Sequence, residues 1–339
     1  MVNLDGLVVL ITGGTGSFGQ KFTQRVLACF KPKKLIIFSR DELKQFEMRQ
    51  RFGEEHYPCL RYFIGDVRDQ ERLYRAFDGV DIVVHAAALK QVPAAEYNPS
   101  EAVKTNVLGA MNVVNAAIDR GVKRVIALSS DKAANPINLY GATKLCSDKL
   151  FVAANSYSGA RATRFSIVRY GNVVGSRGSV LPYFLSLRAT GTLPITDTRM
   201  TRFWITLEQG VDFVLKSLAR MRGGEIFVPK IPSMRITDLA RAVAPECTLK
   251  IVGIRPGEKL HETLVSEDDA RHAVEYDDYY AILPVVHSWD AGDRVLHGGR
   301  PCPDGFCYRS DRNTHWLTIE ELRKIAGLED VRENVTTGN

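Results

Sequence analysis

The sequence predicts an α/β protein, built on a doubly wound parallel sheet with a smaller C-terminal lobe. Short apolar runs rich in β-branched residues alternate with segments of helical period from the N-terminus onward. Such uninterrupted apolar runs are typical of strands that helices cover on both faces. A glycine-rich stretch follows the first run, and beyond about Gly175 the runs become shorter and mix with proline and glycine. We therefore expect residues 1–175 to form the sheet domain, and residues 176–339 mainly the lobe, with some segments returning to the sheet.

The elements follow in order along the chain. Strands are expected within 6–14, 33–40, 61–67, 81–88, 124–130 and 164–173, and shorter ones within 225–230 and 249–254. Helices are expected within 17–30, 41–52, 71–77, 102–121, 143–157, 208–221 and 235–244. Each helix of the first half lies between two strands, which is the order that produces parallel pairing.

Composition narrows the class of protein. The chain has 339 residues, 45% hydrophobic content and a net charge of +6, and its Lys and Arg residues are scattered. This pattern favours attraction of a small anionic molecule and argues against a nucleic-acid partner. No apolar run approaches the roughly eighteen residues of a membrane span, and the first apolar run has no basic flank, so we expect no membrane association and no signal peptide. The six dispersed cysteines suit reduced thiols in the cytoplasm.

No metal site is expected. The one close pair of cysteines is Cys302 and Cys307, and its spacing fits neither a zinc-binding nor a redox pattern.

The stretch TGGTGSFG directly follows the first expected strand. Glycines at this position let the backbone approach a pyrophosphate, and the N-terminus of the next helix attracts its charge. Glycines also serve ordinary turns, but the place after the first strand of an alternating chain favours a dinucleotide site of the Rossmann type. The residues expected to hold the cofactor here are Gly13, Thr15, Gly16, Ser17, Phe18 and Gly19.

The second expected strand ends in FSRDE, where an acidic residue would bind the ribose hydroxyls of NAD. Arg40, beside Ser39 and before Lys44, would instead hold the 2′-phosphate of NADP. Asp41 leaves both readings open, and we favour NADP.

Further cofactor contacts are expected where the next strands end. Asp66, followed by Val67, would accept a hydrogen bond from the adenine amino group, although an N-cap of the next helix explains it nearly as well. Ala86 and Ala87 are small enough to let a cofactor lie across the backbone, and Lys90 then points toward the reacting groups.

Tyr140 and Lys144 lie four residues apart, on one face of a helix. A phenol has a reference pKa near 10, and we expect the ammonium of Lys144 to lower the pKa of Tyr140 so that it can act as a base. Asp131 and Lys132 stand side by side where the preceding strand ends, facing the edge where ligands of such sheets bind. A structural salt bridge is the alternative for this pair.

TGGTGSFG and YGATK together resemble the extended short-chain dehydrogenase/reductase superfamily. Longer stretches, such as SSDKAANPINLYGATKLCSDKLF, RYGNVVGSRGSV and GIRPGEKLHE, resemble one group in it, the inverting UDP-N-acetylglucosamine 4,6-dehydratases that open pseudaminic acid synthesis. The resemblance covers residues 8 to about 283.

The resemblance implies a site and a reaction. Tyr140 takes the C4 hydroxyl proton as hydride passes to NADP, and Ser130 hydrogen-bonds the same oxygen. Lys132 then removes the C5 proton, and Asp131 protonates the C6 hydroxyl that leaves as water. Dehydratases that retain the C5 configuration typically carry Asp-Glu at the positions of Asp131 and Lys132, so Lys132 implies inversion.

The resemblance also implies residues that contact the sugar nucleotide. They are Lys90, Lys132, Asn172, Arg177, Thr196, Arg202, Arg255 and Glu258, with Val173 at the cofactor. It implies a homo-oligomer, a dimer or larger, and a product that enters a glycan of flagellin or of a capsule. Asn106 is expected either to anchor backbone or water near Lys144, or else to cap a helix or pack.

Four other functions share part of this pattern. A C5-retaining UDP-sugar dehydratase and a UDP-hexose 4-epimerase share Tyr140 and Lys144, but the epimerase has no need of Asp131 and Lys132. A non-catalytic NADP-sensing regulator often loses the Tyr-Lys pair. The dehydratases of polysaccharide assembly usually carry long membrane-spanning N-terminal regions.

Overall fold

A computed structural model describes residues 2–176, 178–285 and 298–328 of the chain. By its internal contacts the chain forms two units. Unit 1 comprises Met1–Tyr170, Val211–Lys230 and Leu264–Cys307, and unit 2 comprises Gly171–Gly210, Ile231–Thr263 and Tyr308–Asn339. Two segments of the C-terminal half therefore belong to the unit that holds the N-terminal strands. Chain connectivity crosses between the units within α9 (Leu207–Arg220) and β13 (Thr263–Val265).

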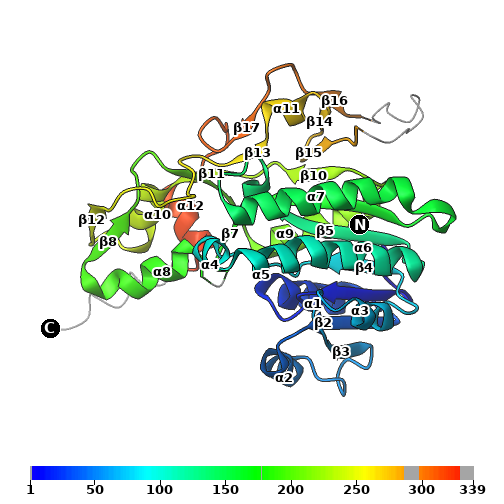
Figure 1. Ribbon diagram of the computed structural model, residues 1–339. Helices are drawn as coiled ribbons and strands as arrows, with labels where there is room; N and C mark the ends of the chain where they lie inside the picture. Colours follow the sequence, from blue (N-terminus) through cyan, green and yellow to red (C-terminus); the bar gives the residue numbers. More distant parts are fainter. Residues whose placement is uncertain (1, 177, 286–297, 329–339) are drawn as a thin grey trace. The chain divides into compact units, whose positions relative to one another are not determined.

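Unit 1 contains a sheet with the strand order β16-β14-β15-β10-β6-β5-β4-β1-β2-β3 (Figure 1). Neighbours are parallel from β3 through β10, and β10, β15, β14 and β16 pair antiparallel. The order reverses between β1 and β4, which confirms the predicted Rossmann-type, doubly wound sheet. The strand bounds are β1 Val8–Thr12, β2 Lys34–Ser39, β3 Leu60–Ile64, β4 Ile82–His85, β5 Arg124–Ser130, β6 Arg164–Tyr170, β10 Ile226–Pro229, β14 Ala273–Glu275, β15 Tyr279–Ile282 and β16 Arg300–Pro301.

Helices fill the connections of unit 1. Their bounds are α1 Ser17–Cys29, α2 Glu42–Arg51, α3 Gln70–Ala76, α4 Val92–Tyr97, α5 Pro99–Val103, α6 Gly109–Asp119, α7 Leu139–Tyr157 and α11 Glu267–Ala270. Helix α6 packs on both α3 and α7, and Figure 1 shows α6 and α7 lying along the sheet. The single helix expected within 102–121 is instead α5 and α6, joined by a π-helical turn over Lys104–Leu108. Such turns are frequent at functional sites.

The sheet is the core of unit 1. All five residues of β1 and all four of β4 are buried, as uninterrupted apolar strands require. Polar residues are buried near the ends of β5 and β6, among them Asp131 and Arg169, and Asp148 is buried on helix α7. Arg169 is one of the largest fully buried side chains. Burial of charge is costly without a partner, so these residues point to a built polar site.

In its described residues, unit 2 is built from small sheets and helices around its own apolar core. β7 (Asn172–Val173), β9 (Thr201–Ile205) and β11 (Ser233–Arg235) form one sheet, and β8 (Thr192–Ile195) pairs with β12 (Thr248–Ile251). Helices α8 (Val180–Leu187), α10 (Ile236–Val243) and α12 (Ile319–Ile325) pack around a core that includes Phe184, Trp204 and Leu239. The short strand β17 (Tyr308–Arg309) also lies in this unit.

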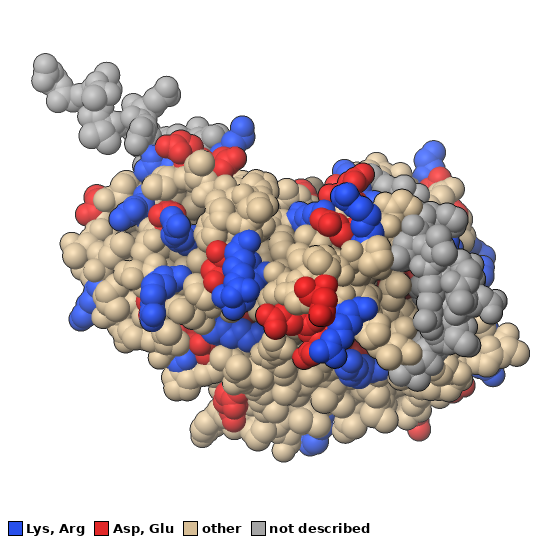
Figure 2. Space-filling view, turned by 90° about the horizontal axis from the view of Figure 1, so that it is seen from above, with Lys and Arg blue, Asp and Glu red and all other residues tan. Residues whose placement is uncertain are grey.

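The surface carries both signs of charge. Figure 2 shows Lys and Arg side chains interspersed with Asp and Glu over the visible face, so the net charge is not gathered there into one basic region. All six cysteines are free thiols. Across the helices that the structure describes, none combines the length and the apolar character needed to cross a bilayer.

Candidate active site

The glycine-rich turn brings the end of β1 against the chain that follows β4. Gly13 has a φ of +67°, and a Cβ there would lie 2.9 Å from the backbone of Ala87. A Cβ at Gly19 would lie 2.3 Å from the carbonyl oxygen of Gly14. Only glycine permits these approaches. Gly16 is the N-cap of α1, and it has no side chain that could hydrogen-bond the first turn of this helix. The turn thus fits a pyrophosphate.

The other residues expected at this turn surround it. Ser17 and Phe18 begin α1, where the Phe18 ring stacks on Phe22. Thr15 is buried, and its hydroxyl lies 2.7 Å from that of Ser39 at the end of β2. The loop and the second strand are therefore joined directly.

Asp41 and Arg40 have different surroundings. The Asp41 carboxylate caps α2 by accepting from the Lys44 backbone N–H at 3.0 Å, and it pairs with the Lys44 ammonium at 2.6 Å. The Arg40 side chain is 56% exposed, and its nearest carboxylate oxygen, on Asp66, is 3.9 Å away. Asp41 is thus paired locally, whereas the ion pair of Arg40 with Asp66 is long.

Asp66 does not cap a helix. The N-cap of α3 is Asp69, which accepts from the Arg72 backbone N–H at 2.9 Å, so the capping alternative for Asp66 is wrong. The Asp66 carboxylate accepts from the backbone and the guanidinium of Arg68 instead. Val67 is buried, and its side chain lies where a Cβ on Gly109 of α6 would be.

The chain after β4 is held from two sides. Thr12 Oγ1 accepts from the backbone N–H groups of Ala86 and Ala87 at 3.2 and 3.3 Å. Buried Asn106, in the π-helical turn, bonds both the N–H and the C=O of Leu89 at 2.8 and 2.9 Å, and donates to the Thr143 hydroxyl at 3.0 Å. Asn106 therefore anchors backbone, one of the two roles expected for it, and ties the residue before Lys90 to helix α7.

Ser130, Asp131 and Lys132 form a compact hydrogen-bonded group. β5 ends at Ser130, and a 3₁₀ turn covers Asp131–Ala133. Ser130 Oγ accepts from the Lys132 backbone N–H at 3.1 Å and donates to Asp131 Oδ1 at 2.9 Å. The Lys132 ammonium donates to the same Oδ1 at 2.9 Å. The Asp131 side chain is 1% exposed and that of Lys132 is 25% exposed, so the pair is open on the lysine side.

Helix α7 lies unusually close to this turn. Asn138 caps the helix by accepting from the Gly141 backbone N–H at 2.8 Å. A Cβ at Gly141 would lie 2.2 Å from the carbonyl oxygen of Lys132. Glycine inside Tyr140-Gly-Ala-Thr-Lys144 is therefore what lets the phenol and the Asp131–Lys132 pair come together.

The electrostatics of Tyr140 differ from the expectation. Burial raises the pKa of Tyr140, while the charge of Lys132 and a hydrogen bond with Ser130 act in the opposite direction. The buried ammonium of Lys144 donates to the Leu128 carbonyl at 2.7 Å. The expected net lowering of the Tyr140 pKa by Lys144 is wrong for this structure, because desolvation dominates and Lys132 is the cation that acts on the phenol.

The charge of Lys132 also affects the pKa of Lys90. Its pKa is lowered by desolvation and by the like charge of Lys132. The charge of Lys132 therefore acts on Lys90 as well as on Tyr140.

The structure adds residues that the sequence argument did not select. His85, Asp148 and Arg169 are buried beside Lys144 or one contact beyond it. Burial lowers the pKa of His85 to about 3, and the charge of Lys144 adds to this effect, so His85 is neutral. A signal for Asp148 was present, since Tyr140, Lys144 and Asp148 repeat every four residues on one helix face.

The substrate residues expected in the C-terminal half are described within unit 2. Arg202 is buried, donates to the carbonyls of Thr201 and Leu260, and lies 3.5 Å from Glu258. The Glu258 carboxylate also accepts from the Arg255 backbone N–H at 3.4 Å, while the Arg255 side chain is exposed. Thus Arg202, Arg255 and Glu258 form one cluster.

The remaining residues of that set are more scattered. Asn172 and Val173 pair with Trp204 and Ile205 across β7 and β9, and the buried Asn172 Oδ1 has no hydrogen-bond partner within the described part of the chain. The Thr196 hydroxyl lies 3.1 Å from the Met200 sulfur. Arg177 lies outside the described residues.

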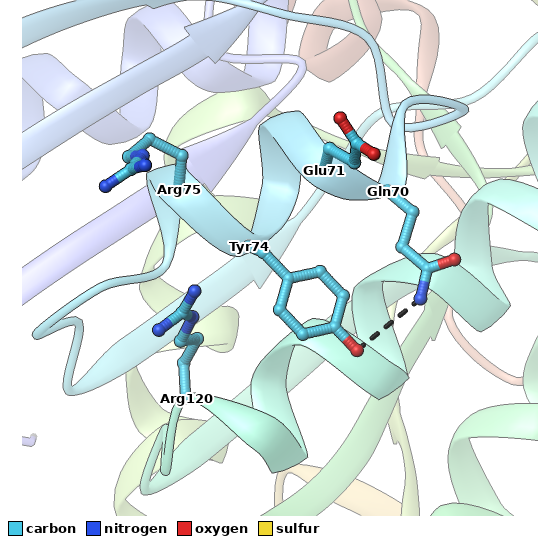
Figure 3. Close-up of a pocket in the computed structure, with 5 residues that line it drawn as sticks. All are labelled: Gln70, Glu71, Tyr74, Arg75 and Arg120. Carbon is cyan, nitrogen blue, oxygen red and sulfur yellow. Dashed lines mark hydrogen bonds between the residues drawn. The ribbon is translucent and has the colours of Figure 1, made fainter.

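A separate hollow of about 430 Å³ lies in unit 1, lined by Gln70, Glu71, Tyr74, Arg75 and Arg120 (Figure 3). The Tyr74 hydroxyl accepts from Gln70 at 3.4 Å, and the Arg120 guanidinium lies over the Tyr74 ring. None of the expected site residues lines it, and two of its groups have partners outside it, since the Tyr74 hydroxyl donates to Asp119 and Arg120 lies 3.8 Å from Asp78.

A family model described as polysaccharide biosynthesis protein matches residues 9–284. The chain belongs to this family. A relative from Campylobacter jejuni, named UDP-N-acetylglucosamine 4,6-dehydratase (inverting), is 59% identical over 94% of this chain and 96% of its own length. This confirms the resemblance found in the sequence. A relative from Rickettsia akari, named UDP-glucose 4-epimerase, is 41% identical over 94% of each chain.

Two solved structures have a similar fold. The X-ray structure of Pen from Bacillus thuringiensis has a TM-score of 0.87 at 36% identity and covers 96% of this chain and 98% of that one. DesIV, a dTDP-glucose 4,6-dehydratase from Streptomyces venezuelae solved with NAD and TYD bound, has a TM-score of 0.67 at 25% identity. It covers 75% of this chain and 87% of that one.

Proposed function

We propose that this family member is an NADP-dependent UDP-N-acetylglucosamine 4,6-dehydratase that inverts C5, a hydro-lyase. One observation carries the proposal, namely the 2.9 Å hydrogen bond from the Lys132 ammonium to Asp131, beside Ser130 and Tyr140. Oxidation and elimination need an acid and a base close to the same sugar, and this group supplies both. The name of the Campylobacter relative supports the substrate and the stereochemistry.

The residues divide the work as follows. Tyr140, with its hydrogen bond to Ser130, takes the proton of the C4 hydroxyl, and the nearby charge of Lys132 favours the phenolate. Moving one proton from Lys132 to Asp131 along their hydrogen bond creates a neutral amine and a carboxylic acid in one step. Lys132 then removes the C5 proton, which the 4-ketone acidifies, and Asp131 protonates the departing C6 hydroxyl.

A bound nicotinamide dinucleotide would accept hydride from C4 and return it at C6. The glycine turn of Gly13, Gly16 and Gly19 is the proposed site of its pyrophosphate, because a Cβ at Gly13 or Gly19 would collide with the backbone of Ala87 or Gly14 and prevent this tight turn. Asp66 and Val67 stay candidates for the adenine side, and Ala86, Ala87 and Val173 for contact along the cofactor. The preference for NADP rests on Arg40, since Asp41 is occupied by Lys44 and the cap of α2.

Arg40→Ala is expected to weaken NADP binding about tenfold or more and to leave NAD binding nearly unchanged, because a charge-assisted hydrogen bond contributes roughly 1.5–3 kcal/mol. Titration of both cofactors by protein fluorescence measures this. Arg49→Ala is the matched control, since Arg49 is similarly exposed, at 54%, on α2 and pairs with Glu54. An unchanged ratio of NADP to NAD affinity in Arg40→Ala would assign the 2′-phosphate to other residues.

The proposed reaction is tested by its closed hydride balance. The enzyme should convert many equivalents of UDP-N-acetylglucosamine without added oxidant, and reduced nicotinamide should not accumulate by absorbance. In D₂O the product should carry one deuterium at C5, and NMR should show a 4-keto-6-deoxy sugar of inverted C5 configuration. Stoichiometric accumulation of NADPH would instead identify an ordinary dehydrogenase.

A UDP-hexose 4-epimerase is the second candidate, favoured by the Rickettsia relative. It would use Tyr140 and Lys144 but would leave C6 oxygenated, so the same NMR experiment separates the two. A C5-retaining dehydratase would give the uninverted 4-keto product at the earliest times.

Further parts of the proposal concern context. We place the reaction at the first step of pseudaminic acid synthesis, in the cytoplasm and in a homo-oligomer. In unit 2, Asn172, Thr196, Arg202, Arg255 and Glu258 are the proposed contacts to the sugar nucleotide, with Arg177 added from the sequence. Lys90 joins them from unit 1.

A further inference from the structure

Helix α7 is fastened to strand β5 at consecutive strand positions. The Lys144 ammonium donates to the Leu128 carbonyl at 2.7 Å, and the Ser129 hydroxyl donates to the Asp148 carboxylate at 2.7 Å. One turn before Lys144, Tyr140 is hydrogen-bonded with Ser130, the next strand residue. The stripe of Tyr140, Lys144 and Asp148 is therefore aligned with the end of the strand that carries the reacting groups.

Positively and negatively charged side chains alternate from Lys144 on this stripe to residues of neighbouring elements. Asp148 Oδ2 lies 3.4 Å from Arg169 of β6, and both side chains are 2% exposed. Arg169 is the direct neighbour of Ser129 in the sheet, and it donates to the Leu264 carbonyl at 3.2 Å. On its other side Arg169 contacts Asp269, which is 26% exposed, at 3.0 Å. Lys144, Asp148, Arg169 and Asp269 thus form a chain of alternating sign that reaches from the interior toward solvent.

A buried ammonium needs such a chain. Desolvation lowers the pKa of Lys144, and Asp148 is the charged group that opposes this. Burial also raises the pKa of Asp148, while Arg169 and Lys144 act in the opposite direction. His85 of β4 cannot replace Asp148, because it is neutral. The charges of Asp131 and Lys132 act on Tyr140 one turn away, and the charge of Asp148 also raises the pKa of Tyr140.

We infer that Asp148 is a positioning residue that acts as the internal counter-ion of Lys144, and that Arg169 holds Asp148 in its ionised form. The contacts to consecutive residues of β5 let one carboxylate both align α7 and keep the ammonium charged. The consequence for catalysis rests on the proposed function, in which Lys144 lies one helical turn from Tyr140 and is a proposed contact to the cofactor.

The protonation state of Lys144 can be observed directly. In the full chain labelled with ¹³Cε-lysine, the Lys144 signal is assigned by its loss in Lys144→Met and then followed over pH. Asp148→Asn should move the Lys144 midpoint down by about 1–3 pH units, the range expected when an opposite charge nearby is removed. Asp269→Asn, the same change on the far side of Arg169, should leave the midpoint at its wild-type value.

A second variant covers the case in which Asp148→Asn does not fold because Arg169 is left unpaired. Asp148→Asn with Arg169→Gln removes both charges together, which such pairs tolerate better. It should show the same downward shift. A wild-type Lys144 midpoint in whichever of these two variants folds would overturn the counter-ion role.

The test also separates this inference from the proposed reaction. Turnover of UDP-N-acetylglucosamine is measured on the same samples, and the alkaline limb of its pH profile should move down with the NMR midpoint in Asp148→Asn. A shifted midpoint in a chain with no dehydratase activity would remove the proposed function and leave the counter-ion in place. Normal dehydratase activity with an unshifted Lys144 midpoint would overturn the counter-ion role and leave the proposed function in place.

Discussion

Lys132→Ala is expected to slow turnover of UDP-N-acetylglucosamine by about 10²–10⁴-fold, the contribution of a general base. The reason is geometric, because Lys132 is the amine hydrogen-bonded to Asp131 at 2.9 Å and the only part of that pair with substantial exposure. The variant should still bind the UDP-sugar, but exchange of the C5 proton with solvent deuterium should fall with turnover. Stopped-flow absorbance of reduced nicotinamide and NMR of C5 measure the two halves separately.

Lys149→Ala is the matched control for this change. Lys149 lies on α7 with an exposed side chain, so its loss should leave both half-reactions unchanged. Asp131→Asn keeps the shape of the acid but cannot donate a carboxylic proton, and it should stop elimination after C4 oxidation. Near-normal turnover of Lys132→Ala would show that Lys132 is only the structural partner of Asp131.

Arg169→Met is expected to lower the free energy of unfolding by about 3–5 kcal/mol, the usual cost of leaving a buried charge without its partner. Arg169 and Asp148 are both almost fully buried, and Arg169 also satisfies the Leu264 carbonyl and reaches Asp269. Methionine keeps much of the volume, so most of the loss reflects charge. Urea unfolding followed by tryptophan fluorescence and circular dichroism measures it.

Arg25→Met supplies the comparison for an exposed pair. Arg25 of α1 binds Asp212 of α9 through two nitrogens at 2.8 and 3.1 Å, with side chains 40% and 31% exposed. Water screens such a pair, so the loss should be about 0–1 kcal/mol. Equal losses in the two variants would mean that Asp148 finds another partner when Arg169 is removed.

Local pattern was enough to predict the fold and the family, and to select the candidate reacting groups. Uninterrupted apolar strands separated by helices fix a parallel sheet, and the glycines of the first turn and the spacing of Tyr140 and Lys144 are properties of short stretches. The same holds for Asp131 and Lys132, whose adjacency places them at one strand end. The four-residue spacing of Tyr140, Lys144 and Asp148 could also have indicated Asp148, which the sequence analysis did not select.

What local pattern cannot supply is the surroundings of each group, because these come from distant segments. The pKa of Tyr140 depends on its burial and on Lys132, so the effect assigned to Lys144 was wrong. The N-cap of α3 is Asp69 and not Asp66, because the identity of a cap depends on the residue at which the helix begins. Arg169 meets Asp148 and Asp269 only after β6 pairs with β5 and the segment 264–307 joins unit 1. Short-range sequence therefore determined which chemical groups are present, and tertiary packing decided their solvation and partners, on which their charge states depend.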